Sequence, residues 1–276
     1  MDTLTQKVVL VTGASSGMGK DFAKALLSQG MIVYAAARRI ERMSDLAELG
    51  AIAVQMDITK EEDIQAAVNK IQTEQGGVDV LINNAGFGLY GAMEDTTIDD
   101  ARYQFEVNLF GLARLTQLLL PEMRKKKAGM IFNISSMGGK VYTPLGSWYH
   151  ATKHALEGWS DCLRIELAPF NIDVVIIEPG AIKTEFSDVM VDPMLKRSGS
   201  TAYGPMAQSL VKATKASYEA GDASEPEVIT DLILKALGEK KPKTRYAAGK
   251  FAKPMMFIRQ WLGDRIYDKV IMSFLK

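Results

Sequence analysis

The chain has few of the residues that build disulfides and metal centres. Its 276 residues include one cysteine, Cys162, and two histidines, His150 and His154. A single cysteine cannot form a disulfide within the chain, which is consistent with a reducing compartment, and we expect a cytoplasmic protein. The cysteine and the histidines also lack the spacing of metal ligands, so we expect no metal site.

An excess of charge and long apolar runs are missing too. Thirty-three basic and thirty-three acidic residues give a formal net charge of zero, so no strong field favours nucleic acid as a partner. The N-terminal segment lacks the basic stretch and long apolar run of a signal peptide, and no uncharged run reaches the ~18–20 residues of a spanning helix. Hydrophobic residues make up 47% of the chain, enough for the core of one domain over residues 1–276.

Short apolar runs alternate with longer segments of helical periodicity. The expected strands are 7–11, 32–37, 52–56, 80–82, 130–134, 174–177 and 244–247, and the expected helices are 17–29, 41–49, 61–75, 100–127, 148–170 and 226–238. This order predicts an α/β fold with a doubly wound, Rossmann-type parallel sheet of about seven strands. Ligands of such sheets bind beyond the carboxyl ends of the strands.

Two segments depart from this alternation. Residues 183–223 are richer in Ser, Gly, Met and Pro, and we expect them to form a lid over a substrate site. Residues 249–276 combine apolar and basic residues in a helical tail. We expect the tail to pack over the site or against another subunit; contact with a membrane surface is the alternative.

A glycine-rich turn follows the first expected strand. Gly13, Gly17 and Gly19 have G-x-x-x-G-x-G spacing and lead into the first helix, with Ser15, Ser16 and Met18 between them. Glycines allow a sharp turn and close approach of a ligand, and the helix N-terminus offers free N–H groups to a phosphate. The spacing favours dinucleotide binding over a plain turn.

The end of the second expected strand indicates which dinucleotide binds. The strand is followed by Arg38 and Arg39, with no acid before Glu41. An acidic residue at this point typically binds a ribose hydroxyl, whereas arginine suits a 2′-phosphate. We therefore expect NADP(H), with Ser15 as a further contact; two solvated arginines are the structural alternative.

Tyr149 and Lys153 lie four residues apart in an expected helix, with Ser136 thirteen residues before the tyrosine. At this spacing the phenol and the ammonium share a helix face. A neighbouring cation lowers the pKa of a phenol, which suits proton exchange with an alcohol or a carbonyl. By itself the pair is also compatible with an aromatic anchor beside a solvated lysine.

The candidate motifs are, in chain order, the glycine turn, Asn83-Asn84-Ala85-Gly86, Ser136, Tyr149, Lys153 and Pro179-Gly180. Taken together, these motifs occur in an order that resembles the short-chain dehydrogenase/reductase family. The resemblance implies that Asn108 is a fourth catalytic residue, which fixes a helix distortion and a water beside Lys153. It also implies cofactor contacts, which comprise Asp57 near the adenine, Asn83, Ala85 and Gly86, Tyr149 and Lys153, and Pro179, Gly180, Ile182 and Thr184 around the nicotinamide.

The implied activity is reversible hydride transfer between NADP(H) and a secondary alcohol or ketone, or an aldehyde and its alcohol. Apolar residues in the lid and facing loops suggest a hydrophobic, steroid- or retinoid-like substrate. They are Leu89, Tyr90, Met93, Met137, Val141, Tyr142, Leu145, Phe186, Val189, Met190, Met194, Leu195 and Tyr203. A 3-oxoacyl-thioester reductase and a non-catalytic NADP sensor or scaffold are the alternatives.

Surplus apolar surface on helices 105–123 and 148–170 suggests a homodimer or homotetramer. For the remaining residues of the second helix we expect simpler roles. His150 and His154 should pack or face solvent rather than act as bases, and Cys162 should be a buried, unreactive side chain.

Overall fold

The computed structural model describes residues 6–275, with the side chains of 186–189 and 218 outside the described part. Among the described residues, seven strands form one parallel sheet in the order β3-β2-β1-β4-β5-β6-β7. The strands are β1 (Val8–Thr12), β2 (Ile32–Ala37), β3 (Ile52–Gln55), β4 (Val80–Asn83), β5 (Gly129–Ile134), β6 (Ile172–Pro179) and β7 (Arg245–Ala248). The predicted sheet is confirmed, and its order reverses direction between β1 and β4.

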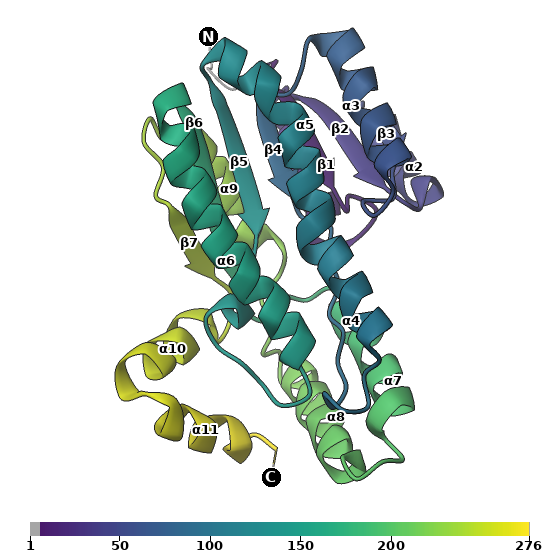
Figure 1. Ribbon diagram of the computed structural model, residues 1–276, viewed down its shortest axis with the longest axis vertical. Coiled ribbons are helices and arrows are strands. Elements are labelled where there is room, and N and C mark those ends of the chain that lie inside the picture. The colour runs from purple at the N-terminus through teal and green to yellow at the C-terminus, as the bar shows by residue number, and fades with distance from the viewer. Residues whose placement is uncertain (1–5, 276) are drawn as a thin grey trace.

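Helices cover both faces of this sheet (Figure 1). They are α1 (Gly17–Ser28), α2 (Ser44–Glu48), α3 (Glu61–Gln75), α4 (Ile98–Phe105), α5 (Gly111–Lys126), α6 (Ser147–Leu167) and α9 (Glu227–Gly238). Side chains of α1, α2 and α9 fill one core layer, including Phe22, Leu46 and Ile233. Those of α3, α5 and α6 fill the other, so both faces of the sheet are buried, as parallel sheets require.

The long helix expected over 100–127 is divided in two. Helix α4 begins at the N-cap Thr97, whose side-chain oxygen accepts a hydrogen bond from the Asp100 N–H at 3.1 Å. A π-helical turn, Glu106–Phe110, then separates α4 from α5 and contains Asn108. Such turns concentrate at functional sites. The helix distortion implied at Asn108 is therefore present.

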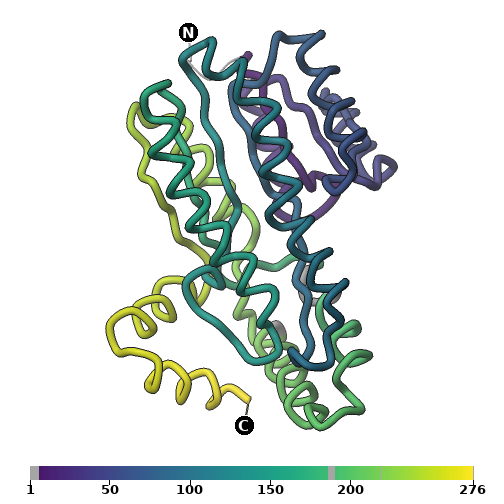
Figure 2. The backbone as a smooth tube through the Cα atoms, in the orientation of Figure 1, coloured from purple at the N-terminus to yellow at the C-terminus, as the bar shows by residue number. Residues whose placement is uncertain are grey.

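The segment 183–223 and the tail both contain helices at the carboxyl end of the sheet (Figure 1). The first holds α7 (Phe186–Ser198) and α8 (Gly204–Glu219), and the tail holds α10 (Ala252–Phe257), a π-helical turn, Ile258–Leu262, and α11 (Asp264–Ser273). The backbone trace in Figure 2 shows the tail folding back beneath the end of α6. Both segments thus lie at the end of the sheet where ligands bind in this architecture.

Candidate active site

The glycine turn is held against the end of β4. Gly13 and Gly17 adopt φ values of +67° and +51°, which favour glycine. The Asn84 side chain donates to the Thr12 carbonyl oxygen at 2.9 Å, and a Cβ atom on Gly19 would overlap both this side chain and the Gly13 carbonyl oxygen. The spacing of the glycines therefore serves close packing between β1, α1 and β4.

The Thr12 hydroxyl fixes the same junction. It is 1% exposed and accepts hydrogen bonds from the backbone N–H groups of Asn84 and Ala85, both at 3.0 Å. It also donates to the Ile82 carbonyl oxygen at 3.4 Å. One buried side chain thus sets the path of the segment that leads to Gly86.

A polar cavity of about 470 Å³ lies at the start of α1. Its lining combines hydroxyls, two cations and two acids, and consists of Ser15, Ser16, Gly17, Lys20, Arg42, Ser44, Asp45 and Glu185. Ser16 makes no side-chain cap of the helix, so its N-terminal N–H groups lack that partner. Hydroxyls, cations and helix N–H groups are the donors that bind phosphate.

The two arginines predicted to bind the 2′-phosphate, Arg38 and Arg39, contact different parts of the protein. Arg38 donates to the Tyr103 hydroxyl at 3.1 Å, on α4. Arg39 instead lies 4.0 Å from the Glu185 carboxylate, which also pairs with Arg42 at 3.3 Å. Lys20, Arg42 and Glu185 were not identified as site residues from the sequence. Lys20 lies three residues after Gly17, and Arg42 lies three residues after Arg39. Since residues three apart in a helical turn lie on the same side, this spacing could have revealed the two cations.

Asp57 and Asn83 are engaged within the protein. The Asp57 carboxylate accepts from the Thr59 N–H at 3.0 Å and from its hydroxyl at 2.8 Å, just after β3. The Asn83 side chain, 2% exposed, donates to Asn133 at 2.9 Å and Thr116 at 3.2 Å. Because it points into the interior, the Asn83 side chain stabilises the sheet and is not exposed to a ligand in this structure.

Ser136, Tyr149 and Lys153 converge beyond the end of β5. The Ser136 side chain accepts from the Gly138 N–H at 3.0 Å, Gly138 lies against the Tyr149 ring, and the Ser136 side chain lowers the pKa of the Tyr149 phenol. Ser135, beside it, is buried against Gly139 and the Lys153 backbone. Ser136 is therefore the serine that contacts Tyr149.

The expected lowering of the Tyr149 pKa is wrong in direction. Burial raises the pKa of Tyr149, and the hydrogen bond with Ser136 offsets this only in part. The Lys153 ammonium donates to the Ile134 carbonyl oxygen at 2.9 Å. Burial lowers the pKa of Lys153 to about 8, against the opposing effect of the Glu157 carboxylate. The dominant influence on both groups is desolvation.

Asn108 links this group to the loop after β4. Its side chain accepts from the Phe87 N–H at 3.1 Å and donates to the Phe87 carbonyl oxygen at 3.0 Å and the Thr152 hydroxyl at 3.1 Å. A Cβ atom on Gly86 would lie 3.2 Å from Asn108 Oδ1 and 3.8 Å from Lys153 Nζ. The absence of a side chain at Gly86 therefore leaves room beside both groups.

Pro179 ends β6, and the following residues continue along the same edge of the sheet. Gly180 donates to the Ala248 carbonyl oxygen at 2.8 Å, and Ile182 pairs with Ser224. Thr184 reaches back to the glycine turn, where a Cβ atom on Gly17 would contact its side chain at 3.3 Å. The predicted Pro179–Thr184 segment and the predicted glycine turn therefore border one site.

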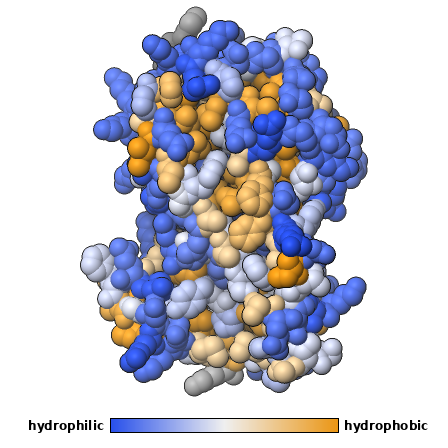
Figure 3. Space-filling model, in the orientation of Figure 1, coloured by the Kyte–Doolittle hydropathy of each residue, from blue (hydrophilic) through white to orange (hydrophobic). Residues whose placement is uncertain are grey.

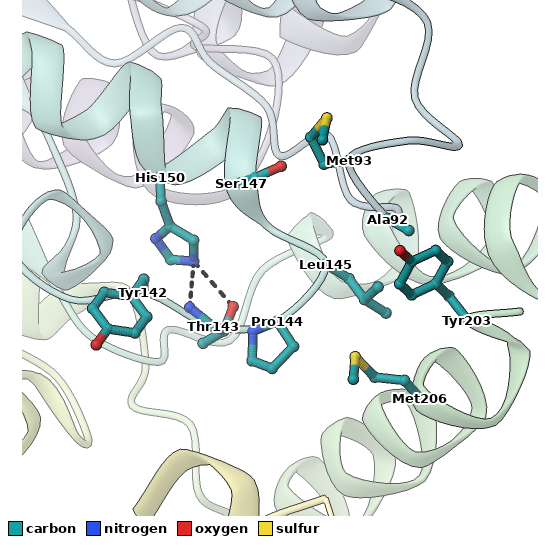
Figure 4. A pocket seen from close by; sticks show the side chains of 10 residues that line it. All are labelled: Ala92, Met93, Tyr142, Thr143, Pro144, Leu145, Ser147, His150, Tyr203 and Met206. Atoms are coloured by element: carbon teal, nitrogen blue, oxygen red, sulfur yellow. Dashed lines mark hydrogen bonds between the residues drawn. The ribbon is translucent and has the colours of Figure 1, made fainter. Parts of the chain in front are cut away.

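An apolar cavity of about 450 Å³ lies between the loop before α6 and the lid (Figure 4). It is lined by Ala92, Met93, Tyr142, Thr143, Pro144, Leu145, Ser147, His150, Tyr203 and Met206. Tyr149 does not line it, but belongs to the same buried cluster as the lining residue Leu145, together with Tyr90, Met190 and Met194. Of the predicted substrate residues, Met93, Tyr142, Leu145 and Tyr203 line the cavity, whereas the side chains of Phe186 and Val189 lie outside the described residues.

His150 has a structural role in the wall of this cavity. Its Nε2 accepts from the Thr143 N–H at 3.0 Å (Figure 4), and its Nδ1 lies 2.9 Å from the Gly138 carbonyl oxygen. Burial lowers the pKa of His150 to about 4, which keeps the ring neutral. The packing role expected for His150 is therefore confirmed. His154 faces solvent, and Cys162 is exposed, contrary to prediction, because it lies on the solvent side of α6.

Within the described residues, no group of three or more His, Cys, Asp or Glu side chains is arranged to bind a metal ion. No helix in this part of the chain is long and apolar enough to cross a membrane.

Comparisons with known proteins agree with this geometry. The chain is 34% identical over 273 residues to 3-ketodihydrosphingosine reductase of Bacteroides thetaiotaomicron, with 97% of each covered. A short-chain dehydrogenase structure from Streptomyces avermitilis superposes with a TM-score of 0.80 at 37% identity, covering 98% of this chain and 95% of that one. Another from Burkholderia cenocepacia, in complex with NADP, has a TM-score of 0.74 at 25% identity and 99% coverage of both chains.

Structures similar to this chain include complexes with NAD and with NADP. The sequence model of the short chain dehydrogenase family matches residues 7–193, which include the glycine turn, Asn108, Ser136, Tyr149 and Lys153. On the family match, the relatives and the fold, this chain belongs to the short-chain dehydrogenase/reductase family of oxidoreductases.

Proposed function

We propose that this protein is an NADP(H)-dependent reductase that interconverts a ketone and a secondary alcohol on a hydrophobic substrate. The observation that carries the proposal is the convergence of Ser136, Tyr149 and Lys153 at the ligand-binding edge of the sheet, where Gly138 contacts both Ser136 and the Tyr149 ring and Ile134 holds the Lys153 ammonium. A sensor or scaffold has no need of a buried proton donor placed in this way. The domain formed by residues 1–276 is then one catalytic unit, which we place in the cytoplasm.

The donors at the start of α1 fit a phosphorylated dinucleotide. The cavity of about 470 Å³ presents Lys20 and Arg42 beside the hydroxyls of Ser15 and Ser16, and Arg39 lies close to the same acid as Arg42. A 2′-phosphate suits the cations of this site, and it would compete with the acids that now pair with them, Asp45 with Lys20 at 2.8 Å and Glu185 with Arg42 at 3.3 Å. We therefore assign the 2′-phosphate of NADP(H) to Arg39, Arg42 and Lys20, with Arg38 nearer the adenine.

The residues around Tyr149 have different roles in the proposed reaction. NADP(H) supplies or accepts the hydride when bound. Because burial keeps the pKa of Tyr149 above its ordinary value, its phenol is protonated near neutral pH and can donate its proton to a carbonyl oxygen. Ser136 donates a hydrogen bond to the same oxygen as charge develops there. Lys153, held by the Ile134 carbonyl oxygen, places its ammonium beside Gly86, where it would hold the ribose hydroxyls of a bound cofactor.

The substrate site favours an apolar chain. Most of the cavity between the loop before α6 and the lid is lined by hydrocarbon side chains and aromatic rings, including Met93, Leu145 and Met206. The 34% identical relative from Bacteroides is named 3-ketodihydrosphingosine reductase. Together these observations support a ketone on a long aliphatic chain more than a small polar acid. Access to Tyr149 then requires movement of Met190 and Met194, which belong to the lid helix α7.

We assign the contacts between subunits to the surface formed by α4, α5 and α6, which we call the α4–α6 face. Phe110 and Ile165 are exposed there, and orange apolar side chains lie among blue ones over the centre of this face (Figure 3). An apolar face of this kind is typical of contact between copies of a chain. We propose that it joins subunits of a homodimer or homotetramer.

A deuterium-transfer assay tests the proposed function. The protein is incubated with 4-deuterated NADPH and, separately, 4-deuterated NADH, and offered long-chain 3-ketones, steroid ketones and 3-oxoacyl thioesters. We expect deuterium on the carbinol carbon of a long-chain ketone, faster with NADPH. Transfer only to the thioesters would favour the carrier-type reductase, and transfer to no carbonyl compound would contradict the proposal.

A further inference from the structure

We propose that the C-terminal tail, residues 251–275, docks on the surface of an anionic lipid bilayer. One side of the tail is already packed against the protein. Tyr267 is fully buried and donates to the Tyr142 carbonyl oxygen at 2.9 Å, and Met255 and Val141 complete a small apolar cluster. The tail is therefore an ordered element with one face held by the loop that lines the substrate cavity.

The tail also exposes an unusual number of large apolar side chains, interspersed with charged ones. Fourteen large hydrophobic side chains are exposed among the described residues, and six of them belong to this 25-residue segment: Phe257, Trp261, Leu262, Ile266, Met272 and Phe274. Trp261 is 68% exposed and lies beside Phe257, with ring centroids 6.5 Å apart. Figure 3 shows orange interrupting the blue surface of this part of the molecule. Such a concentration marks an interaction surface rather than scattered exposure.

The charges of the tail point to an anionic partner. Its described residues carry four cations and two acids, in a chain whose formal net charge is zero. Both acids are engaged, Asp264 with Arg259 and Asp268 with the Tyr142 hydroxyl. Lys253, Arg265 and Lys269 form no ion pair with a described residue.

This pattern distinguishes a lipid surface from a second copy of the chain. Trp, Phe and Leu beside unpaired Lys and Arg are typical of helices that lie in a membrane interface. A symmetric contact between two tails would bring the same cations together, which is unfavourable. Helices of six and ten residues are also far too short to span a bilayer, so the tail lies on the surface.

The tail lies next to the substrate cavity, so docking of the tail on a bilayer affects where that cavity is placed. Tyr142 lines that cavity on the side of the tail, and Tyr203 and Met206 line it on the side of the lid (Figure 4). The lid helix α8 adds two exposed cations, Lys212 and Lys215. Tail and lid lie at the same end of the molecule (Figure 2), so a docked tail brings the cavity close to the bilayer.

Vesicle co-sedimentation of the full chain tests this inference without relying on the proposed function, since no turnover is measured. Vesicles of phosphatidylcholine alone are compared with vesicles that contain equal amounts of phosphatidylcholine and phosphatidylglycerol. We expect binding to the anionic vesicles only, weakened about fivefold for each tail cation removed. Arg265→Glu with Lys269→Glu should therefore leave the protein in the supernatant, and high salt should do the same.

Trp261→Ser has a matched control in Ile165→Ser, because both side chains are 68% exposed and Ile165 lies on the α4–α6 face. Only Trp261→Ser should lose vesicle binding, and circular dichroism confirms that both variants are folded. In the wild type, tryptophan fluorescence should shift to the blue on binding. Equal soluble fractions for all variants, equal binding to neutral vesicles, or a dimer that Trp261→Ser dissociates in sedimentation velocity would each overturn the inference.

Discussion

Glu185 occupies the cationic site assigned to the 2′-phosphate of NADP(H), and its replacement by glutamine gives the most specific test of that assignment. The Glu185 carboxylate pairs with Arg42 at 3.3 Å and lies 4.0 Å from Arg39. A phosphate that binds these arginines must displace the carboxylate. Glu185→Gln removes this competitor, so NADPH should bind more tightly, whereas NADH, which has no 2′-phosphate, should be nearly unaffected.

The size of the effect follows from exposure. The side chains of Glu185 and Arg42 are 52% and 46% exposed, so solvent screens the pair. Exposed ion pairs of this kind contribute roughly 0.2–1 kcal/mol. Since 1.4 kcal/mol corresponds to a factor of ten, the affinity for NADPH should rise about 1.5- to 5-fold. The gain should shrink at 1 M salt, where screening acts over ~3 Å.

Fluorescence titration of NADPH and NADH measures this change as a ratio of two Kd values. Glu225→Gln is the matched control, because Glu225 forms a comparably exposed pair with Lys183 at 3.1 Å, close to the same end of the lid segment. We expect the ratio to change in Glu185→Gln alone. An unchanged ratio, or an equal change in both variants, would refute the assignment of the phosphate to Arg39 and Arg42.

Three further predictions concern stability and the glycine turn. Thr12→Val leaves two partly buried N–H groups without an acceptor and should cost at most about 2–6 kcal/mol in urea unfolding, whereas Thr12→Ser should cost much less; equal losses would contradict the role of the hydroxyl. Burial and the Glu157 charge raise the pKa of Glu178 to about 7 from 4.5, which means that the folded state favours the protonated carboxyl group. The contribution of this group to folding stability is therefore greatest below about pH 4.5 and is lost as the pH rises through 7. Glu178→Gln should therefore gain stability relative to the wild type between about pH 5 and 8, by at most ~1.4 kcal/mol per pH unit, and a constant difference would count against this. Gly19→Ala should unfold more easily and bind NADPH more weakly, because the new methyl group overlaps the Asn84 side chain. The control is Gly158→Ala, which has open space around it and should be neutral or slightly stabilising in the same assays.

The fold was predictable because its signals are local. Buried parallel strands are short apolar runs, such as Ile32–Ala37, and the alternation with helices determines the fold class. The spacing of Ser136, Tyr149 and Lys153 likewise places them together once the strand and the helix have formed. The divided helix at Glu106–Phe110 was not predicted from periodicity; the distortion at Asn108 was expected only from the family resemblance.

What the sequence could not provide depends on tertiary contacts. The direction of the Asn83 side chain is set by Thr116 and Asn133, which are remote in sequence. The raised pKa of Tyr149 reflects desolvation by surrounding elements, which spacing alone does not reveal. Glu185 pairs with Arg42 across 143 positions of the chain, so only the folded structure places an acid among the cations.

Single-turnover hydride transfer in Tyr149→Phe tests the central claim most directly. Tyr90→Phe is the matched control, since Tyr90 is equally buried and packs against Tyr149 with ring centroids 5.7 Å apart. With saturating NADPH and a long-chain ketone, Tyr149→Phe should lose about 10²–10⁴-fold in rate while its NADPH affinity stays near that of the wild type. Tyr90→Phe should retain most of its rate. A Tyr149→Phe variant that transfers hydride as fast as Tyr90→Phe would show that Tyr149 is not the proton donor.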